Sequence, residues 1–322
     1  MRKIIPAFEF RRRAREAMKA FMPILLVVAL IATLPSLISN TVTLMTEADP
    51  NTLVNTFADR LRQVMEKYGV NDPQIAGEIV IDEEQLQADI TTVYDLYMQE
   101  LQTFLKEKGP IVLVLALMVL IASPVLTLGM INALLHALRK QEFTPVIALS
   151  RMKYILKALG LELLVAIKMF LWTLPGALLM VAALFMPQTL MTLTLIVGFA
   201  VMLVLGIMAG YRYAMAVFVL ADEPQTRIRA CIRRSCEVMQ HRKMELFSLE
   251  LSFIGWSLLL SYVQIMFNAF GAVIGMTLGM FASLFLTVYT NCAQAAFYQE
   301  YAVGPVQSAE GEQTPGMNDL NE

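Results

Sequence analysis

Long uncharged stretches alternate with short charged ones along this chain. Phe21–Met45 contains 25 residues without a charge, and Ile111–Leu134 is a second run of this kind. A membrane-spanning helix needs about 20 apolar residues, because the hydrocarbon layer is about 30 Å thick and each helical residue advances about 1.5 Å. Each run therefore predicts one transmembrane helix, at about residues 21–45 and 110–136.

Two longer uncharged runs each predict a pair of spans. Residues 169–211 form a run of 43 and residues 251–299 a run of 49, roughly twice what one crossing uses. Pro187-Gln188 interrupts the first run and Asn268 to Gly271 interrupts the second, and both segments contain typical turn residues. The predicted spans are therefore residues 161–186, 189–216, 247–267 and 272–299.

The composition supports this membrane assignment. Hydrophobic residues make up 57% of the chain, charged residues make up 16%, and the mean hydropathy is +0.60. A soluble globular domain is far less apolar and more highly charged. The sequence therefore predicts an all-α, polytopic membrane protein with six transmembrane helices.

The distribution of lysine and arginine predicts the orientation. Of the 25 basic residues, seven lie in residues 1–20, five in 139–157 and six in 221–245. Basic loops stay on the cytoplasmic side, so these three stretches and both termini are expected there. Residues 46–109 carry 13 acidic and five basic residues and are expected outside.

The external segment, residues 46–109, has the pattern of a helical hairpin. Asp49-Pro50 offers an N-cap followed by a first-turn proline, and apolar residues recur at helical spacing from Leu53 to Tyr68. Asp82 with Gln85 resembles a capping box, and a second apolar face runs from Leu86 to Leu105. We expect the two faces to pack together and to offer a contact for a partner or a second copy.

Two cytoplasmic connectors, residues 139–159 and 222–245, are amphipathic and basic. Such helices lie in the headgroup plane, where their basic side chains meet anionic lipid. Alternatively, they are short connectors whose charges only set the orientation. Residues 1–20 are expected to be a basic juxtamembrane segment, residues 110–301 a five-span bundle, and residues 302–322 a disordered cytoplasmic tail.

The run from Gly210 to Pro224 contains a Tyr-x-Met pattern followed by Leu-Ala-Asp-x-Pro. Further motifs lie at Leu246 to Trp256, at Ala296-Phe297-Tyr298, at Leu171-Trp172 and in the Arg-rich start at Arg11 to Arg15. These segments resemble a bacterial membrane family catalogued as domain of unknown function 975. The resemblance implies a multi-span bacterial plasma-membrane protein and implies no established activity.

The sequence offers little for catalysis. It contains two histidines and three cysteines, and Cys231 and Cys236 lie about 140° apart on a helix, which makes them poor joint metal ligands. Gly-rich phosphate loops and basic patches interleaved with aromatic residues are absent from the sequence. We therefore expect no enzyme activity, no cofactor, no metal site, no nucleic-acid partner, and free thiols at all three cysteines.

Ionisable residues within or next to the predicted spans are the strongest functional candidates, because a charge at the bilayer centre costs at least about 2.5 kcal/mol. The functional interpretation is a polar cavity open to the cytoplasm that binds an anionic ligand or lipid headgroup. The alternative is that the cations extend to the interface or pair with Glu250. The candidate cluster consists of Glu162, Lys168, Arg212 and Glu250.

The last predicted span carries a polar stripe. Hydrogen bonds between helices explain such a stripe without any ligand, and a substrate path is the alternative explanation. The stripe consists of Thr290, Asn291, Gln294 and Tyr298.

Two classes of function remain. The first is a non-catalytic scaffold or accessory module of a membrane complex, which would bind its partner through the external hairpin. The second is a carrier or lipid-handling protein that uses the charges in the inner leaflet. In both, anionic lipids are the expected partners at the cytoplasmic face.

Overall fold

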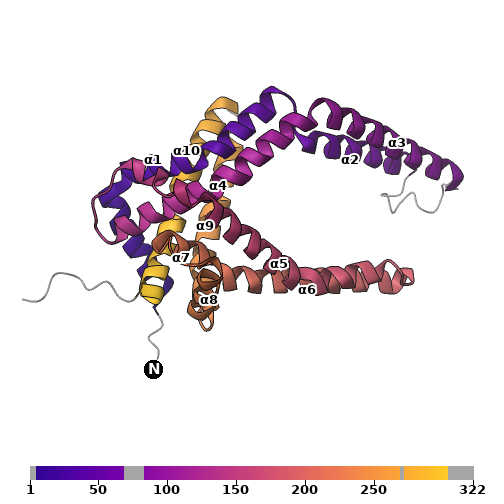
Figure 1. The fold of residues 1–322 in the computed structure, drawn as a ribbon. Helices are drawn as coiled ribbons and strands as arrows, with labels where there is room; N and C mark the ends of the chain where they lie inside the picture. Colours follow the sequence, from indigo (N-terminus) through magenta and orange to yellow (C-terminus); the bar gives the residue numbers. More distant parts are fainter. Residues whose placement is uncertain (1–4, 69–82, 269–271, 304–322) are drawn as a thin grey trace, which may run out of the picture. The chain divides into compact units, whose positions relative to one another are not determined.

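A computed structural model describes residues 5–68, 83–268 and 272–303 of the chain, and these residues are helices and their connections (Figure 1). The ten α-helices within these ranges have the following bounds: α1 Ala7–Met45, α2 Pro50–Lys67, α3 Glu83–Glu107, α4 Gly109–Leu138, α5 Ile155–Ala183, α6 Gln188–Tyr213, α7 Ala216–Asp222, α8 Ile228–Met239, α9 Lys243–Asn268 and α10 Ala272–Tyr298. Three short helical turns accompany them: the 3-10 turns η1 Pro145–Leu149 and η2 Met152–Tyr154, and the π-helical turn η3 Gln299–Val303.

The all-α class is confirmed, and within the described residues five helical segments are long and apolar enough to cross a membrane. They are Ala7–Thr43, Gly109–Leu138, Pro145–Ala183, Leu190–Asp222 and Lys243–Phe267. The predicted sixth span coincides with α10 in position, and the crossing itself remains a prediction. The predicted break at Asn268 to Gly271 falls largely on residues 269–271, outside the described part of the chain.

The helix that contains the first predicted span begins before that span. α1 starts at Ala7, so most of the basic segment of residues 1–20 is helical and continuous with the span. Phe21 interrupts α1 with non-helical dihedral angles, φ −124° and ψ 15°. The predicted boundary between basic segment and span therefore coincides with a kink.

The connector at residues 139–159 differs from the prediction. It contains the two 3-10 turns η1 and η2, and the regular helix α5 starts only at Ile155. Pro145 lacks a backbone donor and opens η1, which packs against α4 where Gly129 faces Ala148. The amphipathic connector of residues 139–159 is therefore not one regular helix, and its turn η1 contacts α4.

The other connectors follow the sequence signals more closely. α5 ends at Ala183 and α6 starts at Gln188, which confirms the predicted break at Pro187-Gln188. In the basic connector of residues 222–245, the amphipathic helix is α8. Residues 304–322, most of the predicted disordered tail, lie outside the described part of the chain.

The unit of residues 34–123 contains α2 and α3, the two helices of the segment predicted to be external. These two helices lie side by side (Figure 1). Asp49 caps α2 as predicted, since its carboxylate accepts a hydrogen bond from the Asn51 backbone N–H. The Phe57 and Tyr97 rings pack with centroids 4.8 Å apart. Asp82, proposed as half of a capping box, lies outside the described residues.

Ion pairs also join α2 and α3. Arg60 donates to Glu100 at 2.7 Å, and Lys67 donates to Asp89 at 2.7 Å. The hydrogen bond between Lys67 and Asp89 raises the pKa of the lysine and lowers that of the carboxyl group. The helices α2 and α3 thus contact one another through the Phe57–Tyr97 ring pair and two ion pairs.

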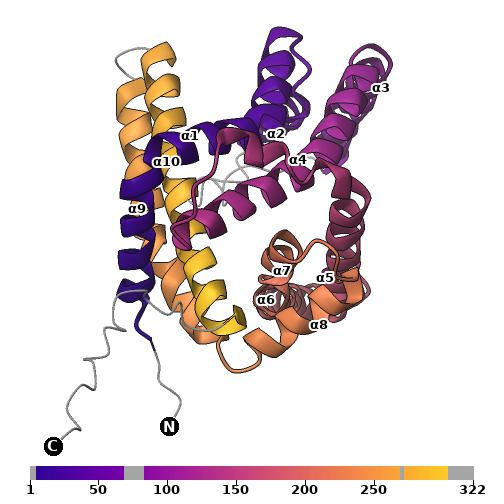
Figure 2. The same ribbon diagram turned by 60° about the vertical axis from the view of Figure 1, so that its left-hand side comes forward.

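The remaining unit, residues 1–33 and 124–322, contains the main core. α5 lies along α6, and α9 lies along α10 (Figure 2). Buried residues gather at the helix ends that the basic residues predict to be cytoplasmic, and the middles of α5 and α6 are largely exposed. The largest fully buried side chains there include Tyr298, Phe10, Phe297, Leu25, Leu134 and Met215.

Candidate functional site

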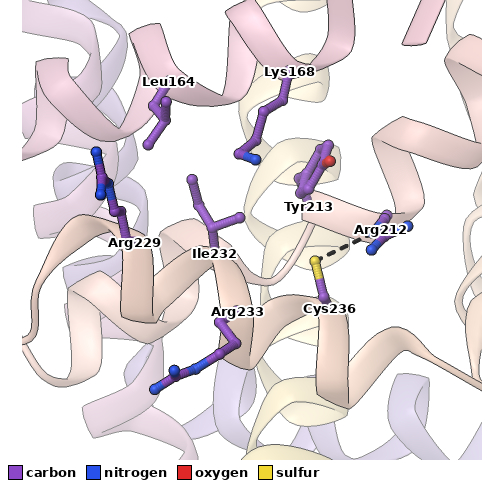
Figure 3. Close-up of a pocket in the computed structure, with 8 residues that line it drawn as sticks. All are labelled: Leu164, Lys168, Arg212, Tyr213, Arg229, Ile232, Arg233 and Cys236. Carbon is purple, nitrogen blue, oxygen red and sulfur yellow. Dashed lines mark hydrogen bonds between the residues drawn. The ribbon is translucent and has the colours of Figure 1, made fainter. Parts of the chain in front are cut away.

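The structure brings two of the four predicted ionisable residues into one pocket. Lys168 extends from α5, and Arg212 lies in the last turn of α6. Their pocket has a volume of about 550 Å³ and is completed by α8 (Figure 3). We call it the cationic pocket; its lining residues are Leu164, Lys168, Arg212, Tyr213, Arg229, Ile232, Arg233 and Cys236.

The four charged residues that line the cationic pocket are all basic. Arg229 and Arg233 come from α8, one helical turn apart. In Figure 3 the Lys168 side chain extends from α5 toward α8, while Arg233 points away from it. Because like charges repel, such a group of cations is favourable only where water, a counter-ion or an anionic ligand offsets it.

Two of these cations have few partners in the protein. No hydrogen bond or ion pair joins Lys168 or Arg229 to any other described residue. Arg212 donates through Nε to Cys236 Sγ at 3.4 Å and lies 5.7 Å from the centre of the Trp172 ring. Arg233 makes only a loose, exposed contact with Glu237 at 3.9 Å. The positive charge in the pocket is therefore largely uncompensated by protein groups.

The position of α8 is fixed by the residues on its buried face. Ser235 is fully buried and donates to the Arg212 carbonyl oxygen at 3.0 Å, which ties α8 to the end of α6. Cys231 is also buried, and burial raises the pKa of its thiol. Arg234 donates to Glu223 at 2.6 Å, and this hydrogen bond raises the pKa of the guanidinium.

Sequence reasoning missed the part that Arg229 and Arg233 play. The amphipathic pattern of the connector of residues 222–245 predicted a helix in the headgroup plane whose basic side chains meet anionic lipid, or a short connector whose charges only set the orientation. One apolar side of α8 is buried as that pattern required, at Cys231, Ile232 and Met239. The spacing of Arg229 and Arg233 by four residues was the available signal, but it could not identify α5 and α6 as the neighbours.

Glu250 does not pair with the cations, which corrects the pairing suggested from the sequence. Its Oε2 accepts a hydrogen bond from the Tyr211 hydroxyl at 2.6 Å, and its Oε1 accepts one from the Gln294 amide at 2.9 Å. Within the described ranges, no ion pair joins Glu250 to Lys168 or Arg212. The reason is rotational, because Tyr211 and Arg212 are consecutive in α6 and point in different directions.

The remaining candidates are dispersed. Glu162 is exposed on α5 and does not line the cationic pocket. In the α10 stripe, Gln294 binds Glu250, Asn291 donates to the Thr287 carbonyl of its own helix, and Tyr298 lies 3.3 Å from Asp222. Thr290 and Asn291 line a groove against α9. The residues of the predicted stripe thus lie in three different environments: beside Glu250, in the groove against α9, and beside Asp222.

A second charged group lies at the end of α7. Asp222 accepts two hydrogen bonds from the Arg139 guanidinium, at 2.8 and 3.0 Å, and its side chain is only 13% exposed. Arg139 also donates to Gln299 at 3.0 Å. The acidic residue of the Leu-Ala-Asp-x-Pro segment therefore connects α4, α7 and the end of α10.

Comparison with known proteins gives one family match. A model of the family described as "Protein of unknown function (DUF975)" matches residues 83–302. The matched region contains every helix of the cationic pocket and the Arg139–Asp222 pair, and it leaves out residues 1–82, including Arg11 to Arg15. No curated protein and no solved structure matched the chain.

Proposed function

The chain belongs to the DUF975 family, and we propose that it is a multi-pass membrane protein that binds a phosphate-bearing anion in the cationic pocket. The supporting observation is that Lys168, Arg212 and Arg229 line one pocket whose lining contains no acidic residue. Hydrogen bonds between such cations and phosphate are about twice as strong as neutral ones. The bound group is the phosphate of an inner-leaflet lipid or of a soluble compound.

We further propose six crossings, with both termini in the cytoplasm of a bacterial cell. The 18 basic residues of the three predicted cytoplasmic stretches support this orientation. The cationic pocket then lies near the cytoplasmic surface, where anionic lipid headgroups are concentrated. In this proposal the protein binds its ligand without catalysing a reaction.

Replacing Lys168 by glutamine should weaken binding of the phosphate-bearing ligand by about tenfold or more, since one charge-assisted contact is worth about 1.5–3 kcal/mol. The measurement is the rate at which N-ethylmaleimide modifies Cys236, which lines the pocket, whereas Cys231 and Cys292 are buried. Phosphatidylglycerol added to the purified protein should slow modification of Cys236, and phosphatidylcholine should not.

Lys153→Gln is the matched control, because Lys153 is an exposed cation outside the pocket lining. It should retain the protection. A parallel titration with inorganic phosphate identifies the source of the ligand: protection by phosphate alone indicates a soluble ligand, and protection by the anionic lipid alone indicates a headgroup. Equal protection of wild type and Lys168→Gln by every probe would contradict the proposed function.

The orientation gives a separate prediction. A membrane-impermeant maleimide should modify Cys236 in inside-out vesicles and leave it unmodified in intact cells, because α8 is expected in the cytoplasm. The Cys236→Ser variant, in which Cys231 and Cys292 remain buried, provides the background signal. Modification of Cys236 in intact cells would reverse the topology.

The second candidate function is a scaffold that binds a partner through an external hairpin of α2 and α3. Val54 and Tyr94 support it, because they are 54% and 53% exposed on this pair. Replacing residues 51–105 by a short linker should preserve membrane insertion and release a copurifying protein or second copy. Retention of the same partner after this deletion would argue against the scaffold.

A further inference from the structure

A second pocket lies between α9 and α10, in the part of both helices that is expected to cross the membrane. This α9–α10 groove has a volume of about 400 Å³, and hydroxyl and amide side chains form most of its lining. Purely lipid-facing surfaces carry few such groups, since hydrocarbon cannot hydrogen-bond to them. Its main polar residues are Ser257, Ser261 and Gln264 from α9, and Ser283, Thr287 and Asn291 from α10.

Three hydroxyls of the groove and one proton of the Asn291 amide are engaged within their own helices, which leaves the side-chain oxygens available. The hydroxyls of Ser257, Ser261 and Ser283 donate to backbone carbonyls of the same helix, at 3.2, 3.0 and 2.9 Å. The Asn291 amide donates to the Thr287 carbonyl at 2.8 Å. Each side-chain oxygen keeps its lone pairs, so the groove presents acceptors for a species that donates or is positively charged.

The acidic residue of α9 nearest to the groove along the helix is Glu250; Glu245 lies further from the groove and accepts a hydrogen bond from the Tyr301 hydroxyl. Glu250 precedes Ser257 by seven residues, about 10 Å or two turns along the same face of α9. On α10, Gln294 lies one turn from Asn291 and holds the Glu250 carboxyl group. The oxygen-lined groove and the acidic group therefore share one side of the helix pair.

We propose that the α9–α10 groove binds a monovalent cation together with part of its water shell. Neutral oxygen atoms from hydroxyls and amides replace the hydration of such an ion, whereas sites for Ca²⁺ or Mg²⁺ are built on carboxylates. No carboxylate lines this groove. Glu250, whose oxygens accept hydrogen bonds from Tyr211 and Gln294, is the carboxyl group on this side of the helix pair toward which a cation in the groove would be attracted.

The test uses the full chain purified in a neutral detergent, with its thermal unfolding followed as sodium or potassium chloride replaces choline chloride at constant total chloride. A bound ion stabilises the folded protein in a saturable manner, and hydroxyl and amide oxygens cannot coordinate choline in this way, because methyl groups cover its charge. Sodium or potassium should therefore raise the unfolding temperature with a defined midpoint concentration. The Ser257→Ala/Thr287→Val variant should raise this midpoint about tenfold or more.

Ser252→Ala is the matched control, because Ser252 belongs to α9, donates to the Leu249 carbonyl and lies outside the groove lining. It should keep the wild-type midpoint. If the double variant does not fold, Thr287→Val alone should raise the midpoint about threefold. Equal stabilisation by choline, or an unchanged midpoint in the folded groove variant, would overturn the proposal.

This inference is independent of the phosphate site. Lys168→Gln removes a cation from the cationic pocket and leaves the groove intact, so the response to sodium or potassium should persist in that variant. Loss of the salt response in Lys168→Gln would contradict a separate cation site in the α9–α10 groove.

Discussion

Replacing Asp222 by asparagine should lower the free energy of unfolding by about 3–5 kcal/mol, because it leaves the partly buried Arg139 without its counter-charge. In the wild type, Arg139 donates two hydrogen bonds to Asp222, and the two side chains are 26% and 13% exposed, respectively. Denaturation by sodium dodecyl sulfate in mixed micelles measures the loss. The double variant Arg139→Gln/Asp222→Asn should recover part of it, since no unpaired charge remains.

Glu237→Gln provides the control for this prediction. Its partner Arg233 lies 3.9 Å away, and both side chains are more than half exposed, so its removal should cost about 0–1 kcal/mol. A loss for Asp222→Asn as small as that for Glu237→Gln would show that the Arg139–Asp222 pair does not hold α4 to α7.

Gly129→Ala should detach η1 from α4 and destabilise the protein by about 1–3 kcal/mol. An added Cβ at residue 129 would lie 1.8 Å from the Ala148 carbonyl oxygen, so the backbone of the turn must move. Thermal unfolding reports the loss of stability, and limited proteolysis within residues 144–150 reports the release of the turn.

Gly255→Ala is a matched change in another helix. A Cβ there meets nothing within 4 Å, and alanine favours helix by up to about 1 kcal/mol over glycine. This variant should be as stable as wild type or more stable. If Gly129→Ala behaves in the same way, the close contact with Ala148 is not a constraint on the fold.

The sequence predicted those structural features that depend only on residues close together in the chain. Uncharged length located the helices assigned as spans, Asp49 marked the start of α2, and Pro187 marked the break before α6. These signals are local, because each arises from the hydrophobicity or backbone preference of a few consecutive residues. The kink at Phe21 lies at the predicted boundary between the basic segment and the first span. The charges of residues 1–20 did not predict that this basic segment is itself helical.

Partners across helices were not predictable in the same way. Glu250 binds Tyr211 and Gln294, while the neighbouring Arg212 turns to Cys236. The choice depends on how α6, α9 and α10 are rotated about their axes, and the apolar pattern of a membrane helix gives little information about rotation because lipid and core are both apolar. For the same reason the sequence analysis placed Lys168 and Arg212 in one candidate cluster, as the cationic pocket does, but could not identify Arg229 as a further residue of that pocket.

The contact between the two ends of the described chain constrains how this protein is synthesised. Arg13 donates to Glu300 at 2.7 Å across 287 residues, and Phe10 packs against Phe297 and Tyr301. At a translation rate of about 5–20 residues per second, the N-terminal helix waits about 15–60 s for these partners. During that interval the Phe10 face of α1 is open to chaperones, to the lipid surface and to incomplete neighbours, so α10 and η3, which are synthesised much later, complete the packing of α1.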